Sequence, residues 1–67
     1  MITVNGQPRD LPAGTPLADV VAELAGPHTG RGVAVAVNGE VVPRGSWATT
    51  TVTTGDKVEV LTATQGG

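Results

Sequence analysis

Cysteine is absent from this sequence, which excludes a disulfide scaffold and a thiolate-bound metal site. Aromatic residues are nearly absent as well, since Trp47 is the only one and there is no Phe or Tyr. The core of the fold must therefore be aliphatic. Valine dominates the apolar residues, and its β-branched side chain favours strands, so we expect a sheet at the centre of the fold.

No excess of one charge marks the chain, which carries four basic and six acidic residues for a net charge of −2. The basic residues Arg9, Arg31, Arg44 and Lys57 are scattered, so no cluster predicts a nucleic-acid site. No apolar run approaches the ~20 residues of a membrane helix, and no signal-like segment follows the first residue. We expect one small cytoplasmic domain, monomeric and without a nucleic-acid or membrane partner.

The first part of the chain predicts a β-hairpin. Apolar and polar residues alternate over residues 1–5, as in a half-buried strand. Asn5-Gly6 follows, and this pair favours a two-residue hairpin turn because both residues tolerate positive φ. Residues 7–11 form the predicted returning strand, and Pro8 places it at an edge of the sheet because proline has no N–H to donate.

A short amphipathic helix comes next. Thr15-Pro16 predicts the N-cap and the first helical residue, and Gly26-Pro27 predicts the end. Asp19 near the start complements the helix dipole, and Asp19 and Glu23 are expected to face solvent. Between these limits the apolar residues recur at i, i+3, i+4 and i+7, which predicts one buried stripe: Leu17, Val20, Val21 and Leu24.

The second half of the chain predicts three more strands. Residues 33–37 alternate Val and Ala without a polar face, which suggests a central strand covered on both sides, or nearly so. Asn38-Gly39 predicts a second hairpin turn, followed by a strand that stops at Pro43. Gly55-Asp56 predicts a turn before a last strand that starts at residue 57. The order β-β-α-β-β-β, with one helix on one mixed sheet, predicts a two-layer α+β domain.

Self-contained catalysis is not expected. His28 is the only histidine, it lies in a glycine-rich loop, and no second base or nucleophile accompanies it. The glycines of residues 26–32 match no phosphate-binding loop, and no ligand set supports a metal. We therefore predict a protein that is not an enzyme and binds no cofactor or metal of its own.

The candidate site is the end of the chain. Residues 1–62 form the predicted domain, and residues 63–67 a flexible tail, because the tail has no large apolar group to bury. It closes on Gly66-Gly67. A glycine end lets the backbone enter a narrow channel and leaves the acyl carbon unhindered. The carboxylate of Gly67 is a poor electrophile until ATP converts it to an acyl-adenylate. A sulfur nucleophile that displaces AMP then leaves a thiocarboxylate, which needs no cysteine in this chain.

Three segments resemble the sulfur carriers of thiamin biosynthesis, the ThiS family. Residues 35–44 with Trp47-Ala48 resemble the mid-chain signature of that family, and the most specific part runs from Val37 to Trp47. Residues 54–60 resemble its Gly-Asp turn and last strand. Gly66-Gly67 resembles its terminus, although the Gly-Asp turn and the diglycine end are shared more widely among ubiquitin-like carriers. The chain departs from many of these relatives in lacking Phe, so we expect its partner surface to use Val and Leu.

The resemblance implies a β-grasp (ubiquitin-like) fold and a division of labour with partner enzymes. An E1-like adenylyltransferase would use ATP to activate Gly67. A cysteine desulfurase or similar donor would supply the sulfur, and the thiocarboxylate would deliver it to thiazole synthase. Thr64, Gln65 and Gly66 would be threaded into the active sites of these partners.

Three alternatives stay open from the sequence. A sulfur carrier for molybdopterin synthesis uses the same terminal chemistry with another partner. A ubiquitin-like modifier would join Gly67 to target lysines by amide bonds. A non-covalent β-grasp binding module would not depend on Gly66-Gly67 at all.

Overall fold

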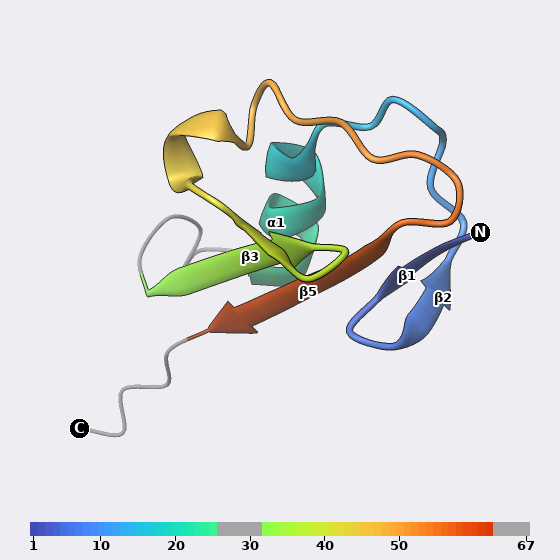
Figure 1. The fold of residues 1–67 in the computed structure, drawn as a ribbon, viewed down its shortest axis with the longest axis horizontal. Helices are drawn as coiled ribbons and strands as arrows, with labels where there is room; N and C mark the ends of the chain where they lie inside the picture. Colours follow the sequence, from blue (N-terminus) through green and yellow to red (C-terminus); the bar gives the residue numbers. More distant parts are fainter. Residues whose placement is uncertain (26–31, 63–67) are drawn as a thin grey trace.

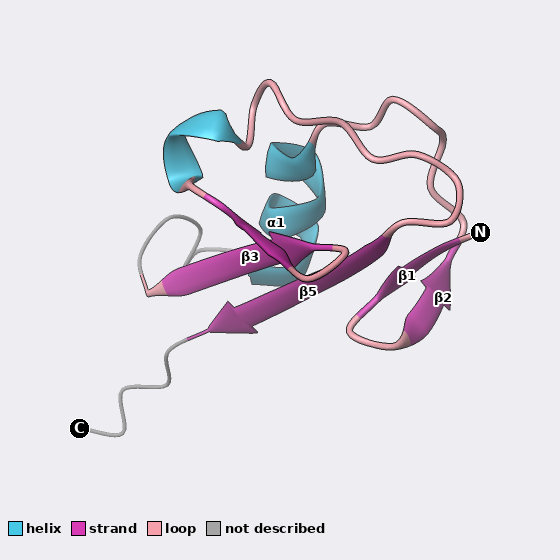
Figure 2. Ribbon diagram, in the orientation of Figure 1, coloured by secondary structure: helices cyan, strands magenta, loops and turns pink. Residues whose placement is uncertain are grey.

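The computed structural model of the chain describes residues 1–25 and 32–62. Within them, helix α1 packs against one face of a five-stranded sheet, and the strands run in the order β2-β1-β5-β3-β4 (Figures 1 and 2). Strands β1 and β5 are parallel, and the other neighbours are antiparallel. The elements are β1 (Ile2–Val4), β2 (Gln7–Arg9), α1 (Leu17–Ala25), β3 (Val33–Val37), β4 (Glu40–Val42), the short 3-10 helix η2 (Arg44–Ser46) and β5 (Lys57–Thr62).

The predicted element order and the two-layer α+β class are confirmed, and the central strand is β5. Both Asn-Gly pairs form the predicted hairpin turns. Their φ angles are positive at both residues, 52° and 82° at Asn5-Gly6 and 53° and 84° at Asn38-Gly39. This is the geometry of a type I′ turn, whose twist matches that of the flanking strands.

Strand β2 is an edge strand, as Pro8 predicts, but it is shorter than expected. The prediction extended it over residues 7–11, and β2 ends at Arg9. Arg9 pairs with Ile2, the first residue of β1. Because β1 begins there, it offers no further strand residue with which Asp10 and Leu11 could pair.

The start of α1 also differs from the prediction. The first helical residue is Leu17, and the carbonyl of Pro16 accepts the N–H of Val20, so Pro16 occupies the cap position. Thr15 does not cap the helix by its side chain, since its hydroxyl donates to the carbonyl of Pro12 at 2.7 Å.

Backbone groups of a distant loop replace that cap. The N–H of Leu17 donates to the carbonyl of Thr50 at 2.7 Å, and the N–H of Ala18 donates to the carbonyl of Trp47 at 3.0 Å. The unpaired N–H groups of a helix start need such partners. The 47–50 loop therefore satisfies the start of α1 and fixes it above the sheet.

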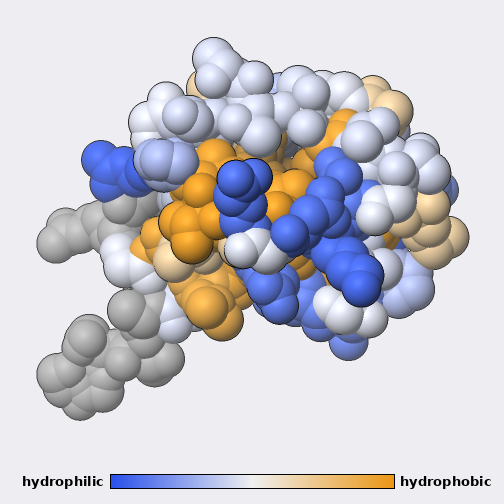
Figure 3. Space-filling view, viewed as in Figure 1, coloured by the Kyte–Doolittle hydropathy of each residue, from blue (hydrophilic) through white to orange (hydrophobic). Residues whose placement is uncertain are grey.

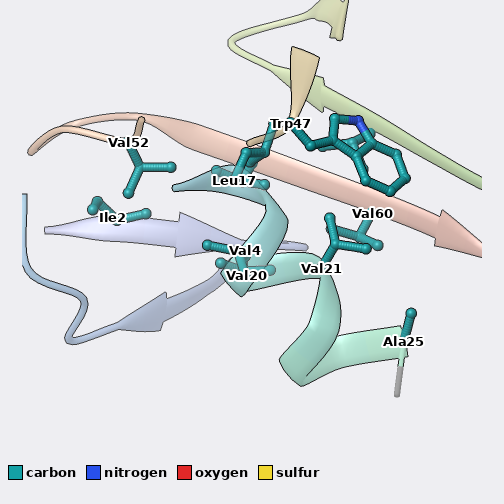
Figure 4. Close-up of a cluster of buried hydrophobic side chains, with 11 residues drawn as sticks. Ile2, Val4, Leu17, Val20, Val21, Ala25, Trp47, Val52 and Val60 are labelled. Atoms are coloured by element: carbon teal, nitrogen blue, oxygen red, sulfur yellow. The ribbon is translucent and has the colours of Figure 1, made fainter. Parts of the chain in front are cut away.

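The core lies between α1 and the sheet, and Figure 4 shows its labelled side chains pointing into this layer. Trp47 closes one end of the layer. It is 4% exposed, and its Nε1 donates to the carbonyl of Val42 at 2.9 Å, so one aromatic side chain joins an otherwise aliphatic core. The buried hydrophobic residues are Ile2, Val4, Leu17, Val20, Val21, Ala25, Val35, Trp47, Val52, Val58 and Val60.

Strand β3 is covered on one face only, which corrects the prediction that both of its faces are covered. Val35 is 1% exposed and faces α1, whereas Ala34 is exposed to solvent. The alternation of Val and Ala explains the error. Alanine is apolar, so its pattern predicts burial, but its side chain is so small that exposing it to water costs little. Helix α1 covers one face of the sheet, and β3 contributes its alanines to the other.

Candidate functional site

The candidate site is the C-terminal end of β5 with the sheet surface beside it. Strand β5 ends at Thr62, which pairs with Val33. The predicted site residues Thr64, Gln65, Gly66 and Gly67 come after it and lie outside the described residues. The predicted division of the chain at residue 62 stays a prediction, and so does the chemistry at Gly67.

Strand β5 is held on one side by the side chain of Asn5. Strand β1 ends before this point, so its backbone cannot pair with Val60. The Asn5 amide takes over: its Nδ2 donates to the carbonyl of Val60 at 3.2 Å, and its Oδ1 accepts the N–H of Val60 at 2.8 Å. The Asn5 side chain thereby makes the two hydrogen bonds to Val60 that a further residue of β1 would otherwise make. Val60 lies two residues before the end of β5.

Asn38 holds the start of β5 on the other side. Its Oδ1 accepts the N–H of Lys57 at 2.9 Å, and its Nδ2 donates to Asp56 Oδ1 at 3.0 Å. Asp56 in turn accepts the N–H of Thr53 at 2.9 Å, within the predicted Gly-Asp turn, where Gly55 has a φ of +94°. The strand that leads into the candidate tail is therefore fixed at both ends by the two hairpin turns.

The face of the sheet that α1 leaves uncovered carries an apolar patch. We call it the alanine trough: Ala34 and Ala36 on β3, flanked by Val41 on β4 and Leu61 on β5. Val41 is 72% exposed and Leu61 is 68% exposed. Figure 3 shows hydrophobic residues gathered over the part of the sheet where β3, β4 and the C-terminal end of β5 lie.

Polar side chains border this patch toward the start of β5. Lys57, Glu59 and Leu61 share the uncovered face because they alternate with the buried Val58 and Val60. A solvent-open depression lies at this end, and it is lined by Asn38, Gly39, Lys57 and Glu59. The uncovered face thus passes from charged to apolar along β5, and the apolar end is next to Thr62.

Other functional classes find no support in the part of the chain that the structure describes. No group of three or more His, Asp or Glu side chains there has the arrangement of a metal site. No described helix is long and apolar enough to cross a membrane. His28, which we predicted to be a loop residue without a catalytic role, lies outside the described residues.

Neither the trough nor the contact of the Asn5 amide was predicted from the sequence. The trough has a sequence signal, because the alternation that buries Val58 and Val60 also places Leu61 on the other face. The neighbours of Leu61 are not deducible from that pattern, since they depend on which strand pairs with β5. The contact of Asn5 with Val60 joins residues 55 positions apart, and no local pattern predicts it.

Comparison with known proteins adds an independent line of evidence. Two solved structures of a thiamine biosynthesis protein (ThiS) from Geobacter metallireducens have the same fold. The crystal structure has a TM-score of 0.77 and 34% identity, and the match covers 98% of this chain and 97% of the other. The solution NMR structure has a TM-score of 0.77 and 35% identity, with coverage of 98% and 86%. A search of the curated proteins finds no match.

The ThiS family model matches residues 2–67, which is nearly the whole chain and includes all the segments that carry the resemblance. The sheet order and the packed helix agree with the ubiquitin-like β-grasp architecture of these neighbours. The chain belongs to the ThiS family.

Proposed function

We propose that this protein is a sulfur carrier of thiamin biosynthesis. The observation that carries the proposal is the family match, which extends through Gly67. The names of the two solved neighbours, both thiamine biosynthesis proteins, favour the thiamin pathway over molybdopterin synthesis. The protein would act as a co-substrate of partner enzymes and not as an enzyme itself.

The proposed chemistry is confined to the carboxylate of Gly67. An E1-like adenylyltransferase joins this carboxylate to the α-phosphate of ATP and releases pyrophosphate. Sulfur at the sulfide level then attacks the acyl carbon, and AMP leaves with the bonding electron pair. Where a cysteine desulfurase or a similar donor supplies the sulfur as a persulfide, the attack gives an acyl disulfide, and a thiol reductant cleaves its S–S bond to leave the thiocarboxylate. The resulting thiocarboxylate gives its sulfur to thiazole synthase. ATP is bound by the adenylating partner, and this chain binds no cofactor.

The described part of the chain supports this role through the way in which β5 is held. Strand β5 is the central strand, and Asn5 and Asn38 fix it, so the tail would start from a rigid point. The family resemblance assigns Thr64, Gln65 and Gly66 to the stretch that enters partner active sites. A rigid exit followed by a narrow glycine end suits presentation of an acyl group to an enzyme.

Intact mass spectrometry tests the proposal. The protein is incubated with the E1-like enzyme encoded in the same genome, ATP and a sulfide source. A mass gain equal to the exchange of one oxygen for one sulfur, localised to Gly67 by fragmentation, is the expected result. A variant that lacks Gly66 and Gly67 keeps all of β5 and should show no gain. An unchanged mass of the wild-type protein, with an enzyme shown to be active, would refute the thiocarboxylate.

Two further outcomes separate the alternatives. Covalent adducts of Gly67 with lysine side chains in cell extract would indicate a protein modifier. Thiazole formation that survives deletion of Gly66 and Gly67 would indicate a binding module that does not carry sulfur. The carrier proposal requires that this deletion abolish thiazole formation while the unfolding transition stays unchanged.

A further inference from the structure

The two asparagines of the chain lie in the same local sequence. Asn5 and Asn38 each form the middle of a Val-Asn-Gly tripeptide, and each lies at the turn of a hairpin. An asparagine before glycine is chemically labile, because glycine has no side chain to hinder its backbone nitrogen from attacking the side-chain amide. The same labile tripeptide therefore occurs in two different surroundings, and the surroundings decide which copy reacts.

We propose that Asn38 is a site of spontaneous deamidation in the folded protein and that the fold protects Asn5 from the same reaction. The inference concerns the start of β5 and does not depend on the proposed function. It adds a modification site whose co-reactant is water and whose product alters a hydrogen bond that holds β5.

The reaction needs only the turn and water. The backbone nitrogen of Gly39 loses its proton to solvent base and attacks Cγ of Asn38. The bond from Cγ to Nδ2 then breaks, and Nδ2 takes up a proton and leaves as ammonia, so a cyclic imide remains. Water opens the imide: its hydroxyl stays on the attacked carbonyl carbon, and the Gly39 nitrogen recovers a proton. Opening at Cγ gives aspartate, opening at the backbone carbonyl gives isoaspartate, and nothing is oxidised or reduced.

Hydrogen bonds of the side chain hold each amide away from this attack. Ring closure requires Cγ to turn toward the nitrogen of the next residue, so the side chain must first release its partners. Both bonds of Asn5 go to the backbone of Val60 and are part-buried. The bonds of Asn38 go to Lys57 and Asp56 and are exposed, so water replaces them more readily. The Asn38 amide is therefore released more often.

Water also reaches the Asn38 turn directly. Asn38 and Gly39 line the solvent-open depression at the start of β5. A Cβ placed on Gly39 would meet no atom within 4 Å, so nothing crowds the attacking nitrogen. Gly6 in the other turn has the same open space. Steric room is thus equal at the two sites, and the hydrogen bonds of the amides make the difference.

The product weakens the anchor at the start of β5. Nδ2 of Asn38 donates to Oδ1 of Asp56 at 3.0 Å. Deamidation to aspartate puts a carboxylate oxygen in its place, so a hydrogen bond becomes a contact between like charges. Isoaspartate inserts its Cβ into the backbone of the turn, which displaces residue 38 from its two bonds with Lys57. Either product loosens the register of β5.

Peptide mapping of the full-length protein tests the inference after incubation in mildly alkaline buffer, below the unfolding temperature. Trypsin places Asn5 in the peptide of residues 1–9 and Asn38 in the peptide of residues 32–44, since cleavage follows arginine. Each deamidation raises the peptide mass by the exchange of one NH2 group for one OH group. Electron-transfer fragmentation distinguishes aspartate from isoaspartate. In the folded protein Asn38 should react about fivefold faster than Asn5.

The unfolded chain is the matched control. In concentrated urea the two identical tripeptides lose their different surroundings, so their rates should agree within about twofold, and both should exceed the rates in the folded protein. The variant Asn38→Gly should abolish the mass gain of the peptide of residues 32–44 and leave the rate at Asn5 unchanged. This variant confirms that the gain is localised to Asn38.

The variant Asn38→Asp tests the effect of the product. It should lower Tm by roughly 4–8 °C in thermal unfolding. The loss should be smaller in an Asp56→Asn background, which removes the facing charge and keeps an oxygen to accept the N–H of Thr53. Equal losses in both backgrounds would show that no like charges meet there, and the stated effect on β5 would be wrong.

The rates decide the assignment of the site. Faster reaction of Asn38 in the folded protein, with equal rates in urea, supports it. Equal rates in the folded protein would mean that the part-buried bonds of Asn5 give no protection, and the inference would be wrong. It would also be wrong if Asn38 stayed intact in the folded protein but reacted in urea. A rate difference that persists unchanged in urea would come from the following residues, Gln7 and Glu40, and not from the fold.

Discussion

The Asn5 amide gives the sharpest test of how the fold holds β5. Asn5→Gly removes both hydrogen bonds to Val60 and keeps the turn, since glycine adopts the φ of +52° without strain. Each hydrogen bond contributes a net ~0.5–1.5 kcal/mol, so losing two lowers the free energy of unfolding by about 1–3 kcal/mol. For a domain of this size, ~1 kcal/mol corresponds to a fall in Tm of roughly 4–8 °C.

Asn38→Gly is the matched control for this variant. Asn38 has a φ of +53° in an equivalent turn, and its side chain also makes two hydrogen bonds, to Asp56 and Lys57. The added backbone freedom of glycine in the unfolded chain is common to both variants and cancels in their difference. The Asn38 bonds are exposed, so water replaces them more readily than the part-buried bonds of Asn5. Asn5→Gly should therefore cost about 1 kcal/mol more than Asn38→Gly.

Urea titration followed by Trp47 fluorescence measures this difference. Trp47 is 4% exposed in the fold, so its emission should shift to longer wavelength on unfolding, and no other aromatic residue contributes. Equal unfolding midpoints for the two variants, with equal slopes, would show that the Asn5 amide adds nothing beyond its exposed counterpart. The account of how β5 is anchored would then be wrong.

Three further substitutions, two of them with a control variant, test other parts of the fold. Trp47→Phe loses the Nε1 hydrogen bond to β4 and some packing, so it should lower the unfolding free energy by about 1–3 kcal/mol in thermal circular dichroism. Gly55→Ala should cost about 1–2 kcal/mol because Gly55 has a φ of +94° with open space around it, so the cost is backbone strain. Gly45→Ala serves as its control in the same denaturant titration. Gly45 has no positive φ and also has open space around it, so the unfolding free energy of this variant should stay within ~0.5 kcal/mol of wild type. Thr15→Ala and Thr49→Ala should have the same unfolding free energy, each within ~0.5 kcal/mol of wild type, because both hydroxyls donate to an exposed carbonyl three residues earlier. A loss above ~1 kcal/mol for Thr15→Ala alone would mean that Thr15 caps α1 after all.

Much of the local structure was predictable because its causes are local. Asn and Gly both tolerate the positive φ that a type I′ turn requires, so the two Asn-Gly pairs predict the two hairpins. The apolar stripe from Leu17 to Leu24 predicts the helix, and Pro8 predicts an edge strand. Each of these signals acts within a few residues, so a single sequence contains it in full.

The features that the sequence did not predict depend on contacts between distant segments. The start of α1 is set by carbonyls of the 47–50 loop, so the local signal of Thr15-Pro16 misplaces it by one residue. The strand order did not follow from the sequence pattern, because periodicity gives the faces of a strand but not its neighbours. For the same reason the alanine trough needed the register of β3 against β4 and β5 before it could be recognised.

Strand β5 shows both a local and a distant cause of structure. Alternation within the strand decides which of its residues face the core, and side chains far away in the sequence fix its register. Val58 and Val60 face the core, so substitutions there should act on unfolding. Lys57, Glu59 and Leu61 face the uncovered side, so substitutions there should have little effect on unfolding. A strand with one buried and one exposed face needs its register fixed, because a slip of one residue would exchange the two faces. The paired hydrogen bonds of Asn5 with Val60 and the bond from Lys57 to Asn38 fix that register at both ends of the strand.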